Sequence, residues 1–182
     1  MPGQRRLGSV GKPIPGIELR IVSLEGEEVA AGQDGEIVVR GPNVMAGYWR
    51  ESQTGIDDGW FATGDIGRVD EDGYLSIVDR KKDLIIRGGH NVFPRDVEDV
   101  LVAHPAVAAA AVVGRPDERL GEEVVAFVAF RPGQAATVEE LAAYVRANLA
   151  ATKYPREIHV LEAIPLTSVG KVDRKRIRSM LA

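Results

Sequence analysis

Residues 79–98, DRKKDLIIRGGHNVFPRDVE, decide the fold of this chain. The charged residues 79–83 favour solvent and predict a boundary between two compact bodies. The apolar run at residues 84–86 predicts a short core strand, and Gly88 with Gly89 allows the backbone a positive φ or a close approach to a ligand. A proline at position 94 then predicts the first turn of a helix.

At 182 residues the chain can hold one medium domain or two small ones, and we expect two. Hydrophobic residues make up 45% of the chain and charged residues 27%, which is typical of proteins with true cores. The net charge of −4 gives no strong field for nucleic acid. Without cysteine, and with three scattered histidines, the chain predicts no metal site.

The opening MPGQRRLGSVGKP carries two arginines but no apolar core segment. No run approaches the roughly 18 apolar residues that a membrane-spanning helix needs. We therefore expect a cytoplasmic protein with neither a signal peptide nor a membrane span.

Short β signals follow one another through residues 8–79. Residues 17–22 and 36–40 predict strands, and the Asp72-Gly73 pair between two apolar runs predicts a hairpin. Residues 1–80 should therefore form a small antiparallel β body.

After the boundary, strands alternate with helices. The helix from Pro94 should end before His104, because a proline follows that residue. Thr137 and Glu140 form a predicted capping box for a second helix. The strand, helix, strand, strand, helix, strand order predicts a ferredoxin-like α+β domain over residues 81–182, with strands at 83–87, 106–113, 123–130 and 157–161.

Asp65 is the first candidate for chemistry, at the end of GWFATGD, residues 59–65. An ionised carboxylate on a tight turn can accept two hydrogen bonds from a ribose diol, and Gly64 would let the sugar approach. An ordinary Asx turn between strands is the alternative.

Arg80 and Lys82 are the next candidates, because a guanidinium can donate to ribose or phosphate oxygens. A charged linker is the alternative for this run. Gly88 and Gly89 could form a flexible loop or a channel wall, and His90 taken alone favours a surface or capping histidine.

Lys171 follows a glycine on a polar stretch near the C-terminus. A lysine on a glycine-loosened loop can place a positive charge where carboxylate and phosphate oxygens gather. Because further basic residues follow it, a solvated basic tail is the alternative.

The order of these motifs resembles the adenylate-forming (ANL) superfamily of acyl-CoA synthetases, peptide-synthetase adenylation domains and luciferases. The resemblance covers nearly the whole chain. The matching stretches are GEIVVRG from Gly35, MAGYW from Met45 to Trp49, TGD from Thr63, DRKKD from Asp79, GGHNVFP from Gly88, KYP from Lys153, and Gly170-Lys171.

This resemblance implies roles for the candidate residues. Asp65 and Arg80 would bind the ribose of ATP or acyl-AMP, and Lys82 would be the hinge. Lys171 would be the catalytic lysine that contacts carboxylate and phosphate oxygens during adenylation. After a swing of the C-terminal domain, Gly88, Gly89 and His90 would face the site and bind CoA. His90 departs from many relatives, which carry an acidic or other residue there. One cleft cannot hold the lysine and the thiol channel at once, so a two-state hinge is expected.

The family's phosphate loop, adenine motif and most of its acyl pocket lie upstream of the residues present here. The resemblance therefore implies a fragment of an ATP- and CoA-dependent ligase, with Mg²⁺ in the full-length enzyme and no adenylation by the fragment alone. Apolar surface left uncovered on the β half would favour a homodimer.

The wording KDLIIRGG from Lys82 resembles fatty-acid or medium-chain acyl-CoA synthetases, with malonyl-CoA and aryl-CoA synthetases left open. The rival interpretation is a stand-alone, non-enzymatic ferredoxin-like binding or regulatory module, in which Lys171 and the glycine pair are surface features.

Overall fold

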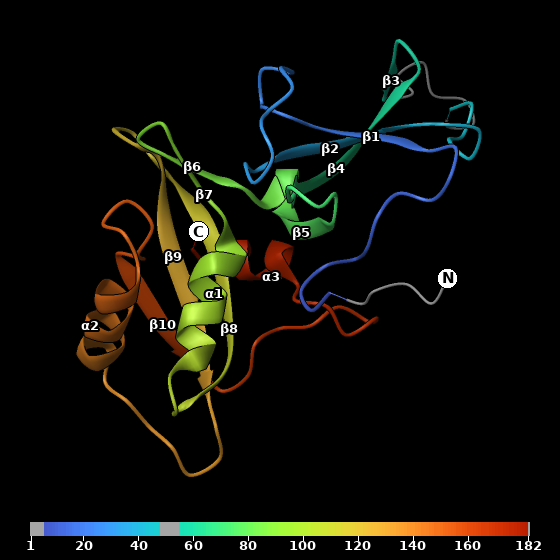
Figure 1. The fold of residues 1–182 in the computed structure, drawn as a ribbon. Helices are drawn as coiled ribbons and strands as arrows, with labels where there is room; N and C mark the ends of the chain where they lie inside the picture. Colours follow the sequence, from blue (N-terminus) through green and yellow to red (C-terminus); the bar gives the residue numbers. More distant parts are fainter. Residues whose placement is uncertain (1–5, 48–54, 182) are drawn as a thin grey trace. The chain divides into compact units, whose positions relative to one another are not determined.

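The structure, a computed structural model, describes residues 6–47 and 55–181 (Figure 1). The chain divides into two compact units, Met1–Lys82 and Asp83–Ala182. Their division falls within the charged stretch, two residues after the boundary that the sequence suggested.

The first unit is built on a five-stranded antiparallel sheet. β2 pairs with one edge of the long strand β4, while β3 and β5 share the other edge at different ends of β4. The strands are β1 (Glu18–Val22), β2 (Gly35–Arg40), β3 (Ile56–Asp57), β4 (Trp60–Val69) and β5 (Leu75–Arg80). The predicted antiparallel β body is therefore confirmed.

The predicted hairpin at Asp72-Gly73 is also confirmed. Gly73 has a φ of +82°, which a residue with a side chain adopts only with strain. Asp70 Oδ1 accepts hydrogen bonds from the backbone N–H groups of Tyr74 (2.9 Å) and Asp72 (3.0 Å). These bonds, the one from Tyr74 first, hold the pKa of Asp70 below its usual value.

The first unit has a thin core. Its described buried apolar side chains are Ile21, Ile37, Ile66 and Val78. The side chains of Leu7, Val10 and Ile14 are instead well exposed to solvent. A sheet of this kind leaves apolar area that a larger body could cover.

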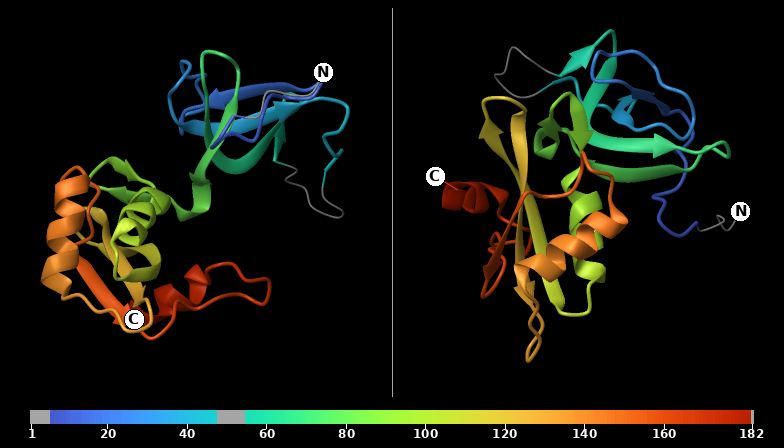
Figure 2. Two further views of the ribbon diagram at one scale, coloured as in Figure 1. Left: turned by 60° about the horizontal axis from the view of Figure 1, so that its bottom comes forward. Right: turned by 90° about the vertical axis from the view of Figure 1, so that its left-hand side faces the viewer.

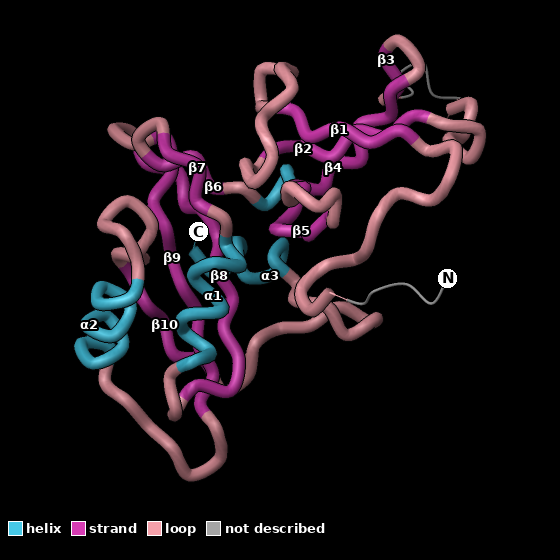
Figure 3. The backbone as a smooth tube through the Cα atoms, in the orientation of Figure 1, coloured by secondary structure: helices cyan, strands magenta, loops and turns pink. Residues whose placement is uncertain are grey.

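The second unit follows the predicted order of strands and helices, with one short strand, β7, that the sequence did not predict (Figure 3). Its elements are β6 (Ile85–Arg87), β7 (His90–Val92), α1 (Pro94–Ala103), β8 (Val107–Asp117), β9 (Gly121–Phe130), α2 (Val138–Asn148), β10 (Glu157–Leu161) and α3 (Arg174–Arg178). Short 3₁₀ turns lie at Lys81–Asp83 and Ser179–Leu181. The predicted α+β class is confirmed.

Helices lie on both sides of the sheet of this unit (Figure 2), and buried side chains form a cluster on each face. Side chains of β9 alternate: Val124 and Ala126 point to the face covered by α1 and α2, while Val125 and Phe127 point to the face covered by α3. A strand buried on both sides needs a continuous apolar run, which β9 has.

The strand pairing differs from that of a regular split βαβ layer. β9 is the central strand, antiparallel to β8 and parallel to β10. β6, the first strand of the unit, has one register pair with β9, Arg87↔Gly121. All three residues of β6 also pair with β7 in a tight hairpin.

The predicted capping box of α2 is present. The Thr137 hydroxyl accepts a hydrogen bond from the Glu140 N–H (3.1 Å), and the Glu140 carboxylate accepts one from the Thr137 N–H (2.8 Å). Leu141 and Val145 are then buried against the sheet.

Replacing Thr137 by alanine removes the side-chain acceptor of this cap. We expect Thr137→Ala to lower the free energy of unfolding by about 1 kcal/mol, and Thr137→Ser to keep it near the wild-type value. Urea denaturation of the 182-residue chain measures both. Equal losses in the two variants would show that the hydroxyl does not act as the cap.

Candidate functional site

The Thr63-Gly64-Asp65 motif lies inside strand β4, which is ten residues long. The register of β4 against β2 shifts here, so the motif forms a bulge. The Thr63 hydroxyl donates to the carbonyl of Ile37 (2.8 Å) and accepts from the Asp65 N–H (3.2 Å). The expected turn between two strands was therefore wrong, because this hydroxyl bridges the two strands and lets β4 continue. Gly64 has a φ of +74°, which favours glycine.

Asp65 and Arg80 are register partners on β4 and β5. Arg80 Nε lies 3.7 Å from Asp65 Oδ1, with side chains 52% and 43% exposed. An ion pair this long and this exposed contributes little to stability. Both groups therefore keep hydrogen-bonding capacity for a solute. They line a groove together with Thr63, Gly64, Lys81 and Lys82.

Lys81, at the start of the 3₁₀ turn, is anchored in the first unit. Its Nζ donates to Glu36 Oε2 at 2.6 Å, and the Glu36 side chain is only 8% exposed. Sequence reasoning missed Glu36. The available signal was an acidic residue placed directly before the apolar run of β2.

Asp83, at the end of the same turn, is anchored in the second unit. Arg178 Nη2 lies 3.3 Å from its carboxylate, and Arg174 Nε lies 4.0 Å away. Lys82 is exposed between these two anchored neighbours.

Gly88 and Gly89 form a two-residue turn between β6 and β7, closed by the Arg87↔His90 pair. Their φ values are +56° and +78°, and positive values at both positions are typical of the type I′ hairpin turn. The flexible-loop alternative is replaced by a regular turn. His90 is exposed as the first residue of β7.

A buried ion pair supports this turn. Arg87 Nε and Nη2 donate to the two carboxylate oxygens of Glu123 at 2.5 and 3.2 Å, with both side chains 10% exposed. Arg87 Nη1 also donates to the carbonyls of Thr152 (3.2 Å) and Ala151 (3.4 Å). A bidentate guanidinium fixes direction as well as distance, so the glycine turn rests on a rigid base.

Lys171 lies on the segment between β10 and α3, and its side chain is exposed. This segment is an ordered turn: the Lys171 carbonyl accepts from the Thr167 N–H (2.7 Å), and the Lys171 N–H donates to Thr167 Oγ1 (3.2 Å). Gly170, with a φ of +77°, permits the turn. The structure therefore shows a hydrogen-bonded turn where the sequence suggested a glycine-loosened loop.

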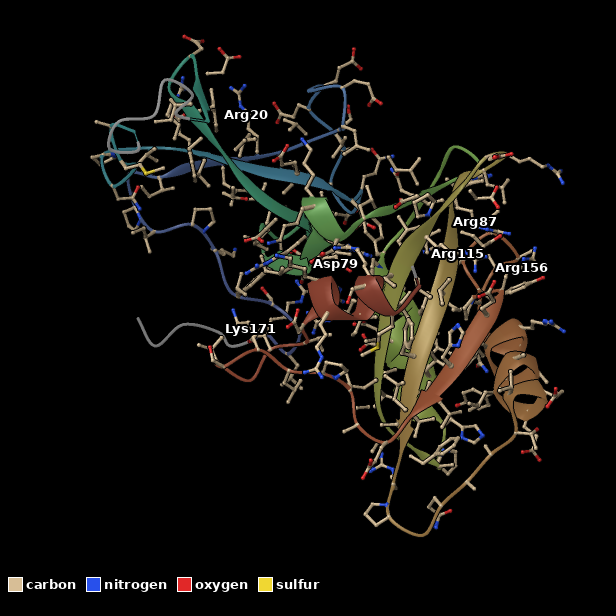
Figure 4. The ribbon with its side chains drawn as sticks, turned by 180° about the vertical axis from the view of Figure 1, so that it is seen from behind. Arg20, Asp79, Arg87, Arg115, Arg156 and Lys171 are labelled. Carbon is tan, nitrogen blue, oxygen red and sulfur yellow. The ribbon has the colours of Figure 1, made fainter. Side chains whose placement is uncertain are left out.

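The structure brings together some of the candidates and separates others. Asp65, Arg80 and Lys82 line one groove of the first unit. In the second unit, Figure 4 shows Lys171 on a different part of the fold from Arg87, the residue next to the glycine turn. Tyr48 and Trp49 of the MAGYW stretch lie outside the described residues.

Among the residues that the structure describes, no group of three or more His, Asp or Glu side chains is placed to hold a metal ion such as Mg²⁺. No helix within residues 6–47 and 55–181 has the length and apolar character needed to cross a membrane.

Comparison with protein families gives two matches. Residues 96–171 match the AMP-binding enzyme C-terminal domain, and residues 1–49 match the AMP-binding enzyme family.

Curated relatives match nearly the whole chain. It is 45% identical to a long-chain-fatty-acid–CoA ligase of Bacillus subtilis, over 96% of this chain and 32% of the relative. It is 43% identical to an indoleacetate–CoA ligase of Aromatoleum aromaticum, over 98% and 36%. The chain thus spans about a third of the length of these relatives.

Solved structures of related synthetases also match nearly the whole chain. MatB of Rhodopseudomonas palustris with bound ATP has a TM-score of 0.91 at 36% identity, over 98% of this chain and 37% of that one. The o-succinylbenzoate CoA synthetase of Bacillus subtilis, in complex with its acyl-adenylate, has a TM-score of 0.84 at 37% identity, over 95% and 36%. The chain therefore belongs to the adenylate-forming superfamily, as a segment that resembles the C-terminal part of its fatty-acid–CoA ligases.

Proposed function

We propose that this chain is the C-terminal portion of an AMP-forming ligase. The whole enzyme would activate a carboxylic acid, with a fatty acid favoured, as acyl-AMP and would then transfer the acyl group to CoA. The observation that carries the proposal is the half-exposed Asp65–Arg80 pair in a groove, in a chain whose relatives are acyl-CoA ligases.

Asp65 would bind the ribose of ATP and of acyl-AMP. Its carboxylate can accept hydrogen bonds from both ribose hydroxyls, and Gly64 leaves open space beside it, because a Cβ built there meets no atom within 4 Å. Arg80 would donate to ribose oxygens from the opposite strand. Both strands belong to one sheet, which supports a pre-formed site.

Lys171 would be the catalytic residue of adenylation. When the acid attacks the α-phosphate, negative charge gathers on carboxylate and phosphate oxygens, and an ammonium group placed there stabilises it. An ordered turn supports this role better than a loose tail, because the lysine then needs less ordering when substrate binds.

Gly88, Gly89 and His90 would face the site during thioester formation and bind CoA. Because Lys171 and the glycine turn lie on different parts of one rigid unit, a single orientation cannot present both to the same site. A swing about Lys82 between two orientations solves this problem. The anchored residues on either side of Lys82 support the assignment of the hinge.

We base the preference for fatty acids on the relatives of this chain, which include a long-chain-fatty-acid–CoA ligase. These also include an amide bond synthetase of Marinactinospora thermotolerans, 42% identical with a TM-score of 0.87.

A cytoplasmic location and a homodimer belong to the same proposal, and light scattering tests the dimer. The rival, a stand-alone binding module, would leave Asp65, Arg80 and Lys171 without any effect on catalysis.

The isolated chain should not adenylate an acid, because it supplies few ligands for the β- and γ-phosphates. We expect no ATP–pyrophosphate exchange with fatty acids. We expect exchange in a hybrid ligase, in which this chain replaces the matching segment of the Bacillus subtilis ligase. A folded hybrid without exchange would contradict the proposed function, and exchange by the isolated chain would contradict the need for a larger body.

Lys171→Ala in the hybrid ligase should separate the two half-reactions. Adenylation should fall by at least about 10²-fold, as expected when one preorganised electrostatic group is lost. Thioester formation from supplied acyl-AMP should change little, because Lys171 would then be turned away. Lys175→Ala, a nearby exposed lysine, is the matched control. Equal losses in both half-reactions would count against the two-state assignment.

Replacing Lys81 should lower the free energy of unfolding more than replacing its neighbour Lys82. Lys81→Met leaves the buried Glu36 carboxylate without its partner, and we expect a loss of about 1–3 kcal/mol in the free energy of unfolding of the isolated chain. Lys82→Met should stay within about 0.5 kcal/mol of wild type, and Lys81→Arg should keep most of the stability. Urea denaturation decides, and similar losses for the two methionine variants would rule out the anchoring role of Lys81.

A further inference from the structure

We propose that Arg174 is a positioning residue for Lys171: it ties the base of the lysine turn to Asp83, next to the hinge, and to Glu98 of α1. This inference rests on the proposed function for its catalytic consequence. The placement of the turn can be tested without it.

Arg174 is part of a nearly buried charge cluster. Its Nη2 donates to Glu98 Oε1 at 2.7 Å, and its Nε lies 4.0 Å from Asp83 Oδ2. The side chains of Arg174, Glu98 and Asp83 are 17%, 16% and 14% exposed. These charged side chains are largely shielded from water. Separating them would leave an unpaired charge in a poorly solvated place, which favours a defined geometry.

The cluster joins three elements at one point. Glu98 Oε1 also accepts a hydrogen bond from the Val112 N–H of β8 at 2.9 Å. Arg174 itself is the first residue of α3. The guanidinium therefore fixes the start of α3 against both α1 and the sheet.

The lysine turn is closed directly before Arg174. Leu166 and Val172 form an antiparallel bridge, and the Asp173 N–H donates to the Pro165 carbonyl at 2.9 Å. Asp173 also caps α3, since its carboxylate accepts from the Arg176 N–H at 3.0 Å. Only Val172 and Asp173 separate Lys171 from Arg174, so a shift of the guanidinium shifts the base of the turn.

The contact between Arg174 and Asp83 would couple the lysine turn to rotation at Lys82. Asp83 follows Lys82 directly, so rotation about Lys82 moves Asp83 first. Through Arg174 the lysine turn moves with Asp83 as one body. Arg174 Nε is buried and has no hydrogen-bond partner among the described residues, which leaves it able to tighten onto Asp83.

Two neighbouring residues serve as comparisons. Arg178 also contacts Asp83, at 3.3 Å, but its side chain is 42% exposed. Lys175 is exposed and follows Arg174 directly. Neither is expected to set the position of Lys171.

The first test measures the placement of the turn in the isolated chain. The chain has no cysteine, so Val102→Cys and Val169→Cys give two unique sites for spin labels, on α1 and on the tip of the lysine turn. Both side chains are exposed, by 38% and 75%. We expect one narrow distance distribution in the wild-type background, measured by double electron–electron resonance.

The variant compared is Glu98→Gln with Arg174→Met. It removes one negative and one positive charge together, leaves Asp83 paired with Arg178, and keeps an oxygen that can accept from the Val112 N–H. This limits the unfolding that an unpaired charge would cause. We expect the distance distribution to broaden or shift, while Lys175→Ala leaves it unchanged. A distribution with the same centre and the same width as wild type in the folded double variant would overturn the proposal.

The second test uses the hybrid ligase. In the double variant, adenylation should fall by about 10²-fold, the scale expected when a reacting group is misplaced by about 1 Å. Thioester formation from supplied acyl-AMP should stay within about threefold of wild type, which a general loss of structure would not allow. Arg174→Lys should recover part of the adenylation rate, because it keeps the charge next to Glu98.

The outcomes separate the two proposals. A hybrid ligase that is inactive with the wild-type chain contradicts the proposed function, and the distance measurement alone then decides whether Arg174 places the turn. A broadened distribution with an unchanged adenylation rate overturns the positioning role while leaving the proposed function standing.

Discussion

Two ion-paired residues lie one on each side of Lys82, the residue that we propose as the hinge. Lys81 holds the buried carboxylate of Glu36 in the first unit, and Asp83 lies among the guanidinium groups of Arg174 and Arg178 in the second. Each tie restricts the backbone on its own side. In the proposed hinge, the exposed residue between them would then take up most of the backbone rotation.

Rigidity on both sides makes such a hinge useful. The Asp65–Arg80 groove is built on paired strands, with a threonine hydroxyl fixing the bulge. In the second unit, a sheet buried on both faces carries the glycine turn on the buried Arg87–Glu123 pair. Groups held this firmly can be moved as a whole without losing their geometry, which is what alternating half-reactions would demand.

Local patterns predicted much of this structure. The Asp72-Gly73 hairpin, the helix between Pro94 and the His104-Pro105 step, and the Thr137 capping box all depend on neighbours within a few residues. The bulge at Thr63 and the contacts of Glu36 and Arg174 could not be predicted in this way. Their partners lie 26, 45 and 76 residues away, and pairing over such separations follows from the fold rather than from local sequence. The order of Lys171 and its turn was missed because a glycine suggests freedom, whereas Gly170 here permits a closed turn.

A distance measurement across Lys82 in the hybrid ligase would decide between a hinged and a fixed arrangement. One spin label would be placed in each unit, and spectra would be recorded with a non-hydrolysable acyl-adenylate analogue, with and without CoA. A hinge at Lys82 predicts two discrete distances whose populations change when CoA is added, and Lys82→Pro should favour one of them. A single distance that is the same in both states would contradict the exchange of Lys171 and the glycine turn over one site.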